Sequence, residues 1–244
     1  MTSDTIASVL VVDDDIDTCR NLSDILTDLG YEVAVAHDGT AALELVREQP
    51  FDVALLDLKM PGMDGLTLYR EIKKLRAGTV AIVISAFASV ENESAAYAEG
   101  CVRVLAKPVN FNQLLPLLGT ALQQPTILVV DDDRDLCANL WDVLRHHGYR
   151  VCLAHDEEQA KSRLLERRFD LVLIDMKLPK GDGSSVLLQV RAENPDARVV
   201  LITGFRGEME AVIQRALTDG ADTVLYKPFD MPLLLDTVQQ LAKS

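Results

Sequence analysis

The chain has 244 residues, of which 48% are hydrophobic and 25% are charged, and its formal net charge at pH 7 is −14. This composition is typical of a soluble globular protein that can form two apolar cores. No apolar run approaches the roughly 18 residues that cross a bilayer, the N-terminus lacks a secretory signal, and neither a basic face nor a nucleic-acid recognition motif is visible. We therefore expect a cytoplasmic protein that binds neither a membrane nor nucleic acid directly.

The first predicted strand, residues 8–12, leads into an acidic cluster, and this pattern returns later in the chain. Leu10-Val-Val-Asp-Asp-Asp reappears as Leu128-Val-Val-Asp-Asp-Asp, at an offset of 118 residues. Between residues 10–38 and 128–156, 18 of 29 aligned positions are identical. A repeat this long is a whole domain, because solenoid units have about 20–50 residues. We expect two domains, residues 1–123 and 124–244.

The chain has four cysteines, and their spacing fits neither a zinc site nor a disulfide framework. Cys19 and Cys137 occupy the same place in the two repeats. We expect these two to be small buried side chains. We expect none of the four cysteines to bind a metal or to form a disulfide.

Within each repeat, short apolar runs alternate with amphipathic stretches, which predicts βα units and a parallel sheet. Strands this apolar are buried on both faces, so helices must cover both sides of the sheet. Right-handed crossovers then favour an α/β fold of two flavodoxin-like (βα)5 domains with strand order 2-1-3-4-5. The predicted strands are residues 8–12, 32–36, 53–57, 80–85 and 104–107, and then residues 127–130, 150–154, 171–175, 199–203 and 224–227.

One glycine and one proline affect where the predicted helices begin and end. Gly30 follows the first helix, where a C-terminal glycine is expected. The fifth helix is expected to begin at Asn110 or Asn112 and to end near Leu122. Pro116 inside it predicts a kink or a late helix start, because proline lacks the backbone donor and clashes with the preceding turn.

Polar side chains stand where the predicted strands end. Ligand sites in such sheets form at the carboxyl ends of the strands, so these side chains are expected to converge on one pocket in each domain. Lys227 follows its hydroxyl residue at a distance two residues longer than Lys107 does, which places a two-residue insertion in the second domain. The converging residues are Asp13, Asp14, Asp57, Ser85 and Lys107 in the first domain and Asp131, Asp132, Asp175, Thr203 and Lys227 in the second.

This set of groups predicts phosphoryl chemistry. Three crowded carboxylates stay ionised most easily around a hard divalent cation, and Mg²⁺ takes a few carboxylates while keeping waters for an incoming phosphate. A lysine and a hydroxyl suit a phosphoryl group, since the ammonium counters its charge and the hydroxyl donates a hydrogen bond. The reaction that fits is in-line attack by Asp57 on a phosphoryl donor to give an acyl phosphate.

At these residues the chain resembles the response-regulator receiver domain of two-component signalling, and the resemblance covers nearly the whole chain, twice. The ordered motifs that carry it are Val12-Asp13-Asp14, Leu56-Asp57-Leu58-Lys59-Met60-Pro61-Gly62-Met63-Asp64-Gly65, Ile84-Ser85-Ala86 and Lys107-Pro108, repeated as Val130-Asp131-Asp132, Ile174-Asp175-Met176-Lys177-Leu178-Pro179-Lys180-Gly181-Asp182-Gly183, Ile202-Thr203-Gly204 and Lys227-Pro228.

The resemblance implies a role for each of these residues. Asp57 and Asp175 would accept the phosphoryl group from a phosphohistidine of a histidine kinase or phosphotransfer protein. One Mg²⁺ per receiver would be held by the acceptor, by the acidic pair (Asp13 and Asp14, or Asp131 and Asp132) and by one backbone carbonyl (Lys59 or Lys177). The phosphoryl group would be gripped by Ser85 and Lys107 in one domain and by Thr203 and Lys227 in the other.

The chain also departs from the family pattern. Val104 and Val224 stand where the family often carries an aromatic switch residue three positions before the lysine. The usual rotamer swing coupled to phosphorylation therefore cannot operate. The first repeat also has Cys101-Val102-Arg103 where the second keeps the commoner Ala221-Asp222, and its fourth-helix region is two residues shorter, so we expect the two sites to behave unequally. Phe87 and Phe205, two residues after the hydroxyl residue, either narrow access to the site or pack on the fourth helix.

Neighbouring residues have simpler interpretations. We expect Asp15 and Asp133 to be helix caps or solvated neighbours rather than metal ligands. The matched His37 and His155 are expected to be surface loop residues, not phosphate carriers.

Three functions remain open. The leading one is a tandem-receiver response regulator without a DNA-binding or enzymatic output domain, which signals through contacts with a downstream protein, another regulator or a second copy in a homodimer. The alternative is a scaffold or docking module in which one or both receivers have lost regulated phosphorylation. The third is an enzyme such as an aspartyl-nucleophile phosphatase, which we disfavour beyond self-catalysed phosphotransfer and autodephosphorylation. The initiator methionine and a last helix ending near Leu241 suggest a complete unit.

Overall fold

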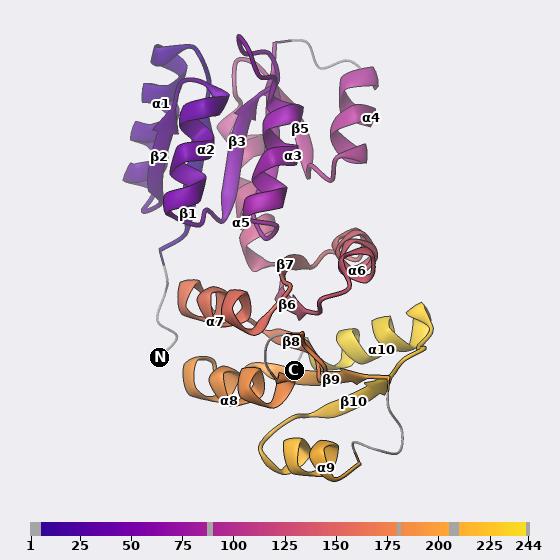
Figure 1. Ribbon diagram of the computed structural model, residues 1–244. Coiled ribbons are helices and arrows are strands. Elements are labelled where there is room, and N and C mark those ends of the chain that lie inside the picture. The colour runs from indigo at the N-terminus through magenta and orange to yellow at the C-terminus, as the bar shows by residue number, and fades with distance from the viewer. Residues whose placement is uncertain (1–5, 87–89, 180–181, 205–209, 243–244) are drawn as a thin grey trace. The chain divides into compact units, whose positions relative to one another are not determined.

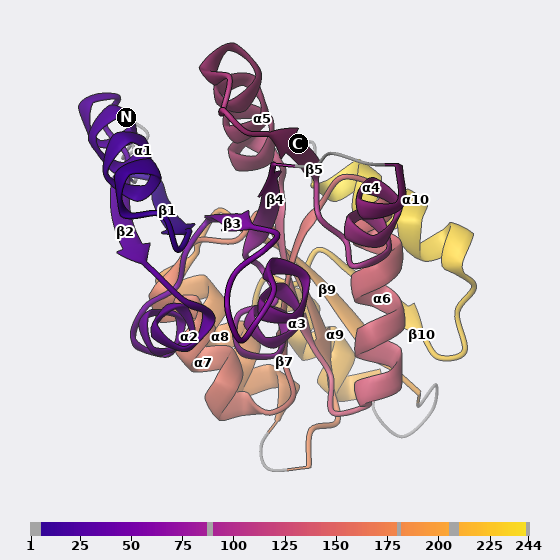
Figure 2. The ribbon, with the colours of Figure 1, turned by 90° about the horizontal axis from the view of Figure 1, so that it is seen from above.

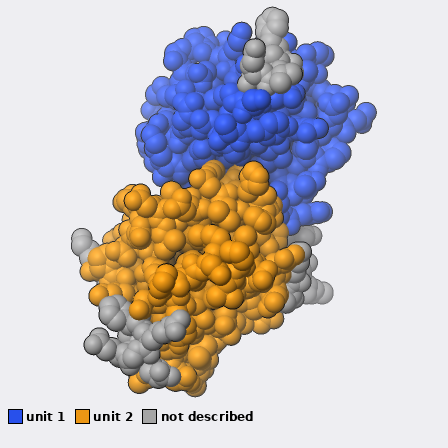
Figure 3. All heavy atoms as spheres, turned by 90° about the vertical axis from the view of Figure 1, so that its right-hand side faces the viewer, with its two compact units in different colours: residues 1–124 blue, residues 125–244 orange. Residues whose placement is uncertain are grey.

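The computed structural model describes residues 6–86, 90–179, 182–204 and 210–242. The chain divides into two compact units, Met1–Gln124 and Pro125–Ser244, which Figure 3 shows in two colours. None of the helices in these described ranges combines the length and the apolar character that crossing a bilayer requires. Phe87 and Phe205 lie outside the described residues.

Each unit contains one five-stranded parallel sheet, and the strand order is the predicted one (Figure 1). The first sheet has the order β2-β1-β3-β4-β5 and the second, read from its matching edge, β7-β6-β8-β9-β10. The flavodoxin-like α/β prediction is thus confirmed in both units. The strands are β1 (Ser8–Val12), β2 (Glu32–Ala36), β3 (Val53–Asp57), β4 (Val80–Ser85), β5 (Arg103–Ala106), β6 (Thr126–Val130), β7 (Arg150–Ala154), β8 (Leu171–Asp175), β9 (Arg198–Thr203) and β10 (Thr223–Tyr226).

Helices cover both faces of each sheet, as the apolar strands require (Figures 1 and 2). Five helices belong to the first unit: α1 (Ile16–Asp28), α2 (Gly39–Glu48), α3 (Gly65–Leu75), α4 (Val90–Ala98) and α5 (Phe111–Gln123). The second unit repeats them as α6 (Arg134–His146), α7 (Glu157–Glu166), α8 (Gly183–Glu193), α9 (Glu210–Thr218) and α10 (Met231–Leu241).

Alternating side chains of the strands form two core layers in each unit. In the first unit, Val9 and Val11 of β1 pack with α1 and α5, whereas Leu10 and Val12 pack with α2, α3 and α4. The second unit has the same arrangement, with α6 and α10 on one face and α7, α8 and α9 on the other. The sheet is therefore buried on both faces, and only its strand ends and edges are left to carry polar groups.

One detail of the chain, the start of α5, differs from the sequence-based expectation. The prediction that α5 starts late is wrong. The side chain of Asn110 caps the helix by accepting from the backbone N–H of Asn112 at 2.9 Å, well before Pro116. The expected two-residue insertion of the second unit is present, and it lies outside the helices, because α4 and α9 have nine residues each. The insertion falls between Thr203 and Glu210. Gly30 also has the expected left-handed backbone, with φ of 90°.

Candidate functional site

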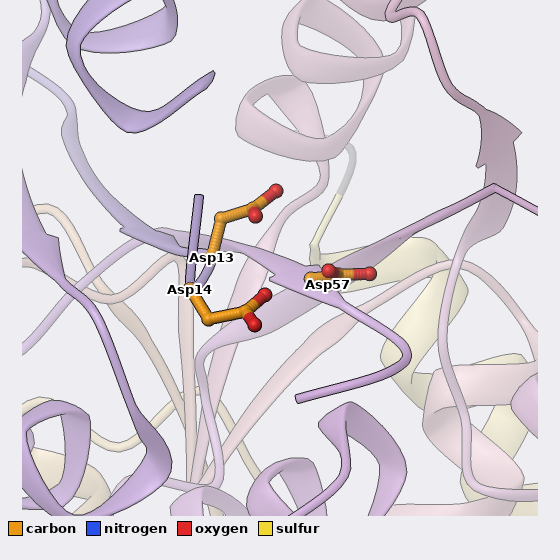
Figure 4. Close-up of side chains that lie close together, drawn as sticks. All are labelled: Asp13, Asp14 and Asp57. Carbon is orange, nitrogen blue, oxygen red and sulfur yellow. The ribbon is translucent and has the colours of Figure 1, made fainter. Parts of the chain in front are cut away.

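The carboxyl edge of each sheet gathers three aspartates from two neighbouring strands. Asp13 and Asp14 follow the end of β1, and Asp57 is the last residue of β3 (Figure 4). In each unit, one oxygen from each of the three carboxylates lies within 4.8 Å of the others. Asp13 and Asp57 are buried, whereas Asp14 is exposed, and Asp131, Asp175 and Asp132 repeat this pattern.

A lysine from the edge strand bridges the two buried carboxylates. The Nζ atom of Lys107 lies 2.7 Å from Oδ2 of Asp13 and 2.8 Å from Oδ2 of Asp57. In the second unit, the Nζ atom of Lys227 donates to Oδ2 of Asp131 at 2.7 Å and to Oδ2 of Asp175 at 2.8 Å. The ammonium group therefore offsets the charge of two carboxylates that would otherwise repel each other at close range.

The backbone holds the other oxygen of each buried carboxylate. The N–H of Asp15 donates to Oδ1 of Asp13 at 3.0 Å, and the N–H of Lys59 donates to Oδ1 of Asp57 at 3.2 Å. The second unit makes the corresponding bonds from the N–H of Asp133 and of Lys177, both at 3.0 Å. Asp13, which follows β1, and Asp57 at the end of β3 are thus preoriented on two sides.

Burial and the neighbouring charges shift the pKa values of these groups in opposite directions. Burial raises the pKa of Asp13 above its usual value, although the hydrogen bond from Lys107 lowers it. Burial also raises the pKa of Asp131, against the effect of Lys227. Burial lowers the pKa of Lys107, but its hydrogen bonds to the two carboxylates outweigh this and leave the pKa raised. The aspartates of β1 and β6 are thus carboxylates whose ionised form is costly and whose compensating charge is a lysine.

The hydroxyl residues lie at the same edge. Ser85 and Thr203 are the last residues of β4 and β9, and each is only 1% exposed. The backbone N–H of Lys107 donates to the carbonyl of Ser85 at 2.8 Å, and that of Lys227 donates to the carbonyl of Thr203 at 2.7 Å. This bond keeps each lysine next to its hydroxyl residue although the lysine itself stands one position beyond the strand. All ten predicted strand-end residues are therefore brought together, five in each unit.

The remaining predicted residues flank the cluster. Lys59 and Lys177 come two residues after Asp57 and Asp175, with exposed side chains. Asp15 and Asp133 cap α1 and α6, as expected, because Asp15 accepts from the N–H of Asp17 and of Thr18. The Lys107–Pro108 and Lys227–Pro228 peptide bonds that follow the lysines are cis.

Sequence reasoning missed a set of contacts behind the acidic pair. His37 is an exposed loop residue, as expected, but its Nδ1 lies 3.4 Å from the carbonyl oxygen of Asp13, and the thiol of Cys19 donates to the same oxygen at 3.2 Å. His155 and Cys137 contact the carbonyl oxygen of Asp131 in the same way, both at 3.2 Å. The only signal in the sequence was that the histidine and the cysteine are identical in the two repeats.

The donor set suits a hard cation. All three side chains offer oxygen, two of them are buried carboxylates, and the third is exposed at the mouth of the site. Mg²⁺ prefers oxygen ligands and few carboxylates, whereas zinc sites and softer metals use cysteine and histidine. Fold and site together define a class of protein, a doubly wound α/β domain with an acidic, lysine-bridged site at the point where strand order reverses.

Comparison with known proteins narrows this class. A family model described as the response regulator receiver domain matches twice, over residues 9–118 and 127–239. The response regulator receiver protein Anae109_2439 of Anaeromyxobacter sp. (strain Fw109-5) is 34% identical over 235 residues, which are 96% of this chain and 95% of that protein. The transcriptional regulatory protein ZraR of Escherichia coli (strain K12) is 43% identical over 122 residues, which are 50% of this chain but only 27% of ZraR.

Among solved structures, a CheY-like receiver domain protein from Methanospirillum hungatei JF-1 is 33% identical, covers 48% of this chain and 94% of its own, and has a TM-score of 0.46. The two family matches and the relative that spans nearly the whole chain are decisive. The chain belongs to the response regulator receiver family and carries two receiver domains in tandem.

Proposed function

We propose that each receiver accepts a phosphoryl group, on Asp57 in the first and on Asp175 in the second, and that the protein signals through protein contacts. The observation that carries this proposal is the lysine-bridged carboxylate cluster, which occurs in both units with nearly the same distances. We assign residues 1–123 and 124–244 to the two receivers. Receiver domains generally interact with histidine kinases or phosphotransfer proteins, and we assign such a phosphohistidine protein as the donor.

The chemistry is an in-line displacement. A carboxylate oxygen of Asp57 attacks the phosphorus of the phosphohistidine, the P–N bond breaks with its electron pair going to the imidazole, and an acyl phosphate forms. Lys107 already lies 2.8 Å from the acceptor carboxylate, so its ammonium can follow the charge to the transferred phosphoryl oxygens. Ser85 supplies a hydroxyl donor from the adjacent strand end. Thr203 and Lys227 would act in the same way on the group transferred to Asp175.

The clustered carboxylates support the assignment of the metal ligands, and the resemblance to the family adds one backbone carbonyl in each receiver. Asp13, Asp14 and the acceptor Asp57 would hold one Mg²⁺ in the first receiver, with the backbone carbonyl of Lys59 as a further ligand. Asp131, Asp132, Asp175 and the carbonyl of Lys177 would do so in the second. When bound, the ion offsets the negative charge that carboxylates and phosphoryl oxygens bring together. Apart from transfer to its own aspartate and hydrolysis of the acyl phosphate, we assign the chain no catalysis, and we place it in the cytoplasm.

Transmission of the signal must use another element than an aromatic side chain at the usual position. Val104 is buried, and Val224 packs at the edge of the second core, so neither offers a ring that could change rotamer. Phosphorylation can favour one conformer only through interactions that differ between two states. Pairing of two copies or binding of a downstream protein is the output that such a shift would control.

The test is intact-mass spectrometry after incubation with acetyl phosphate and Mg²⁺. We expect two added phosphates on the wild type and one on each of Asp57→Asn and Asp175→Asn. Asp64→Asn is a matched control, because Asp64 is an exposed aspartate that caps α3 by accepting from the N–H of Thr67 at 2.7 Å. It should keep both labels.

A scaffold function is the second candidate, and the valines at the switch positions favour it. It would be supported if no phosphate were added while a control receiver was labelled by the same donor. A single added phosphate would leave one receiver as the acceptor and the other as a docking module. Turnover of a generic phosphomonoester would instead support an enzyme.

A further inference from the structure

The backbone carbonyl between the two acidic residues of each site is held by two side chains. The carbonyl oxygen of Asp13 accepts from the thiol of Cys19 at 3.2 Å, and the Nδ1 of His37 lies 3.4 Å from it. Because a carbonyl oxygen only accepts, the imidazole nitrogen that faces it must carry the hydrogen. The same oxygen of Asp131 is contacted by Cys137 and His155 at 3.2 Å each. The arrangement is thus repeated in full.

These contacts stand at the end of the ladder between two strands. The N–H of Asp13 still donates to the carbonyl of Ala36 at 3.3 Å, in register with the pairing of β1 and β2. Directly beyond this bond, α1 supplies the cysteine and the loop after β2 supplies the histidine. Side chains therefore continue the restraint at the point where the chain leaves the sheet.

Restraint of this oxygen restrains the next residue. The carbonyl of Asp13 and the N–H of Asp14 belong to one planar peptide unit. When its oxygen is held, the orientation of that unit is set, and the direction in which the Asp14 side chain leaves the backbone is restricted. The carboxyl of Asp13 is held independently, by the N–H of Asp15 and by Lys107.

Asp14 depends on this restraint more than its neighbours do. Its side chain is exposed, and within the described part of the chain no hydrogen bond or ion pair holds its carboxylate. Asp132 is in the same situation in the second unit. The aim of these two carboxylates is therefore left to the backbone, whereas Asp57 and Asp175 are fixed through their own oxygens.

We propose that His37 with Cys19, and His155 with Cys137, are positioning residues that aim Asp14 and Asp132 at the magnesium ion by holding the preceding peptide plane. This inference rests on the proposed function, since it concerns the same metal site. Residues behind the ligands of a metal orient those ligands, and their loss commonly weakens metal binding by about 10- to 100-fold. Because the effect here passes through one peptide unit, we expect the lower end of that range.

The test is calorimetric titration of Mg²⁺ into the full chain, with one site removed so that the other is measured alone. In a reference variant carrying Asp132→Ala, only the first site should bind. Adding His37→Leu should raise the Mg²⁺ dissociation constant roughly tenfold. In His37→Asn, whose amide nitrogen can donate from a similar place, the dissociation constant should stay within about threefold of the reference. Cys19→Ala should weaken binding too, and Cys19→Ser, which keeps a donor, should restore most of it.

Two controls separate positioning from a general loss of structure. Cys101→Ala removes a buried thiol far along the chain from the acidic pair, and His147→Leu removes an imidazole that contacts the carbonyl of Val143 at 2.8 Å. Both should leave the dissociation constant unchanged, whatever they do to thermal stability. His155→Leu in a chain carrying Asp14→Ala repeats the test in the second unit should a variant of the first unit not fold.

The outcomes are distinguishable. Unchanged dissociation constants in both His37→Leu and Cys19→Ala, with the reference variant binding Mg²⁺, would overturn the positioning role and leave the proposed function standing. If the reference variant itself bound no Mg²⁺, the proposed metal site would be wrong, and the inference would fall with it.

Discussion

Removal of the bridging lysine tests the charge balance of the site most directly, and the second unit is the better place to do it. Lys227 lies 2.7 Å from Asp131, whose side chain is fully buried, and 2.8 Å from Asp175, whose side chain is 10% exposed. Breaking a buried ion pair by removing one partner costs about 3–5 kcal/mol, because an uncompensated buried charge remains. The side chain of Lys227 is itself 27% exposed, so water would screen part of this, and we expect about 3 kcal/mol for Lys227→Met at pH 7 in EDTA.

The loss should show as a lower unfolding temperature of one unit. For a unit of this size, 1 kcal/mol corresponds to roughly 4 °C, so the expected shift is about 10–12 °C. Trp141 is the only tryptophan of the chain and lies on α6, so its fluorescence follows the second unit specifically. Lys161→Met is the matched control, because Lys161 is 41% exposed and pairs with Glu157 on one helix. It should cost less than about 0.5 kcal/mol.

The stability that Lys227→Met loses should depend on pH. Burial already raises the pKa of Asp131 above the ordinary value of 3.8, and loss of the lysine removes the hydrogen bond that opposes this shift. Between the ordinary and the raised pKa the folded state binds more protons than the unfolded state, so the stability of the variant rises as the pH falls. The difference from wild type should therefore shrink toward about pH 5. An unfolding temperature within about 2 °C of wild type at pH 7, or a loss of equal size at both pH values, would refute the reasoning.

Three further predictions concern stability and access. Asp13→Asn should stabilise the metal-free protein by roughly 0.5–2 kcal/mol at pH 7, because burial raises the pKa of Asp13 and makes its ionised form costly; thermal unfolding in EDTA should show the gain, and its absence would mean that Lys107 fully offsets the burial. Gly65→Ala should destabilise the first unit and lower phosphate labelling of Asp57, because a Cβ atom there would meet the carbonyl oxygen of Asp57. Gly119→Ala on α5 is the control, because a Cβ atom there meets open space; it should raise the free energy of unfolding by up to about 1 kcal/mol. Chemical denaturation would measure both changes. All four cysteines are buried, so a thiol reagent should modify none of them in the folded protein and all of them after unfolding; rapid modification without denaturant would contradict this.

The sheet could be predicted from the sequence because its signals are local and occur twice. Apolar runs of four to six residues set the strands to within one residue at each end. The largest differences fall on the edge strands, where β5 begins at the polar Arg103 and ends before Lys107. An apolar run cannot reveal that the backbone of Arg103 pairs with Ile82. Even so, Lys107 was placed correctly, because its N–H continues the ladder to Ser85.

The contacts of the site could not be predicted in the same way. That the aspartates and the lysine converge follows from the topology, since carboxyl ends of parallel strands share one edge. That Lys107 bridges two carboxylates, and that His37 and Cys19 hold the carbonyl of Asp13, depends on rotamers and on the close packing of three separate elements. The late start predicted for α5 from Pro116 was also wrong. Pro116 removes one backbone hydrogen bond, but the cap at Asn110 and the apolar face of α5 are sufficient to form the helix ahead of it.

The two receivers keep the same chemical groups but support them differently, which gives the expected inequality a physical basis. In the second unit, Glu157 at the start of α7 accepts from the hydroxyl of Ser185 at 2.7 Å and from the N–H of Asp182 at 3.2 Å, and so ties α7 to the start of α8. The matching position in the first unit is Gly39, where an added Cβ would meet the side chain of Met63. There the side chain of Met63 packs against the same junction, and a glycine has no side chain that could accept such a hydrogen bond. A polar tie restricts how the two helix starts can move against each other, whereas a flexible thioether can repack. We therefore expect the first turn of α3 to exchange its amide hydrogens faster than the first turn of α8, and expect Glu157→Gly to remove that difference; equal exchange in the wild type would show that the tie does not order the start of α8.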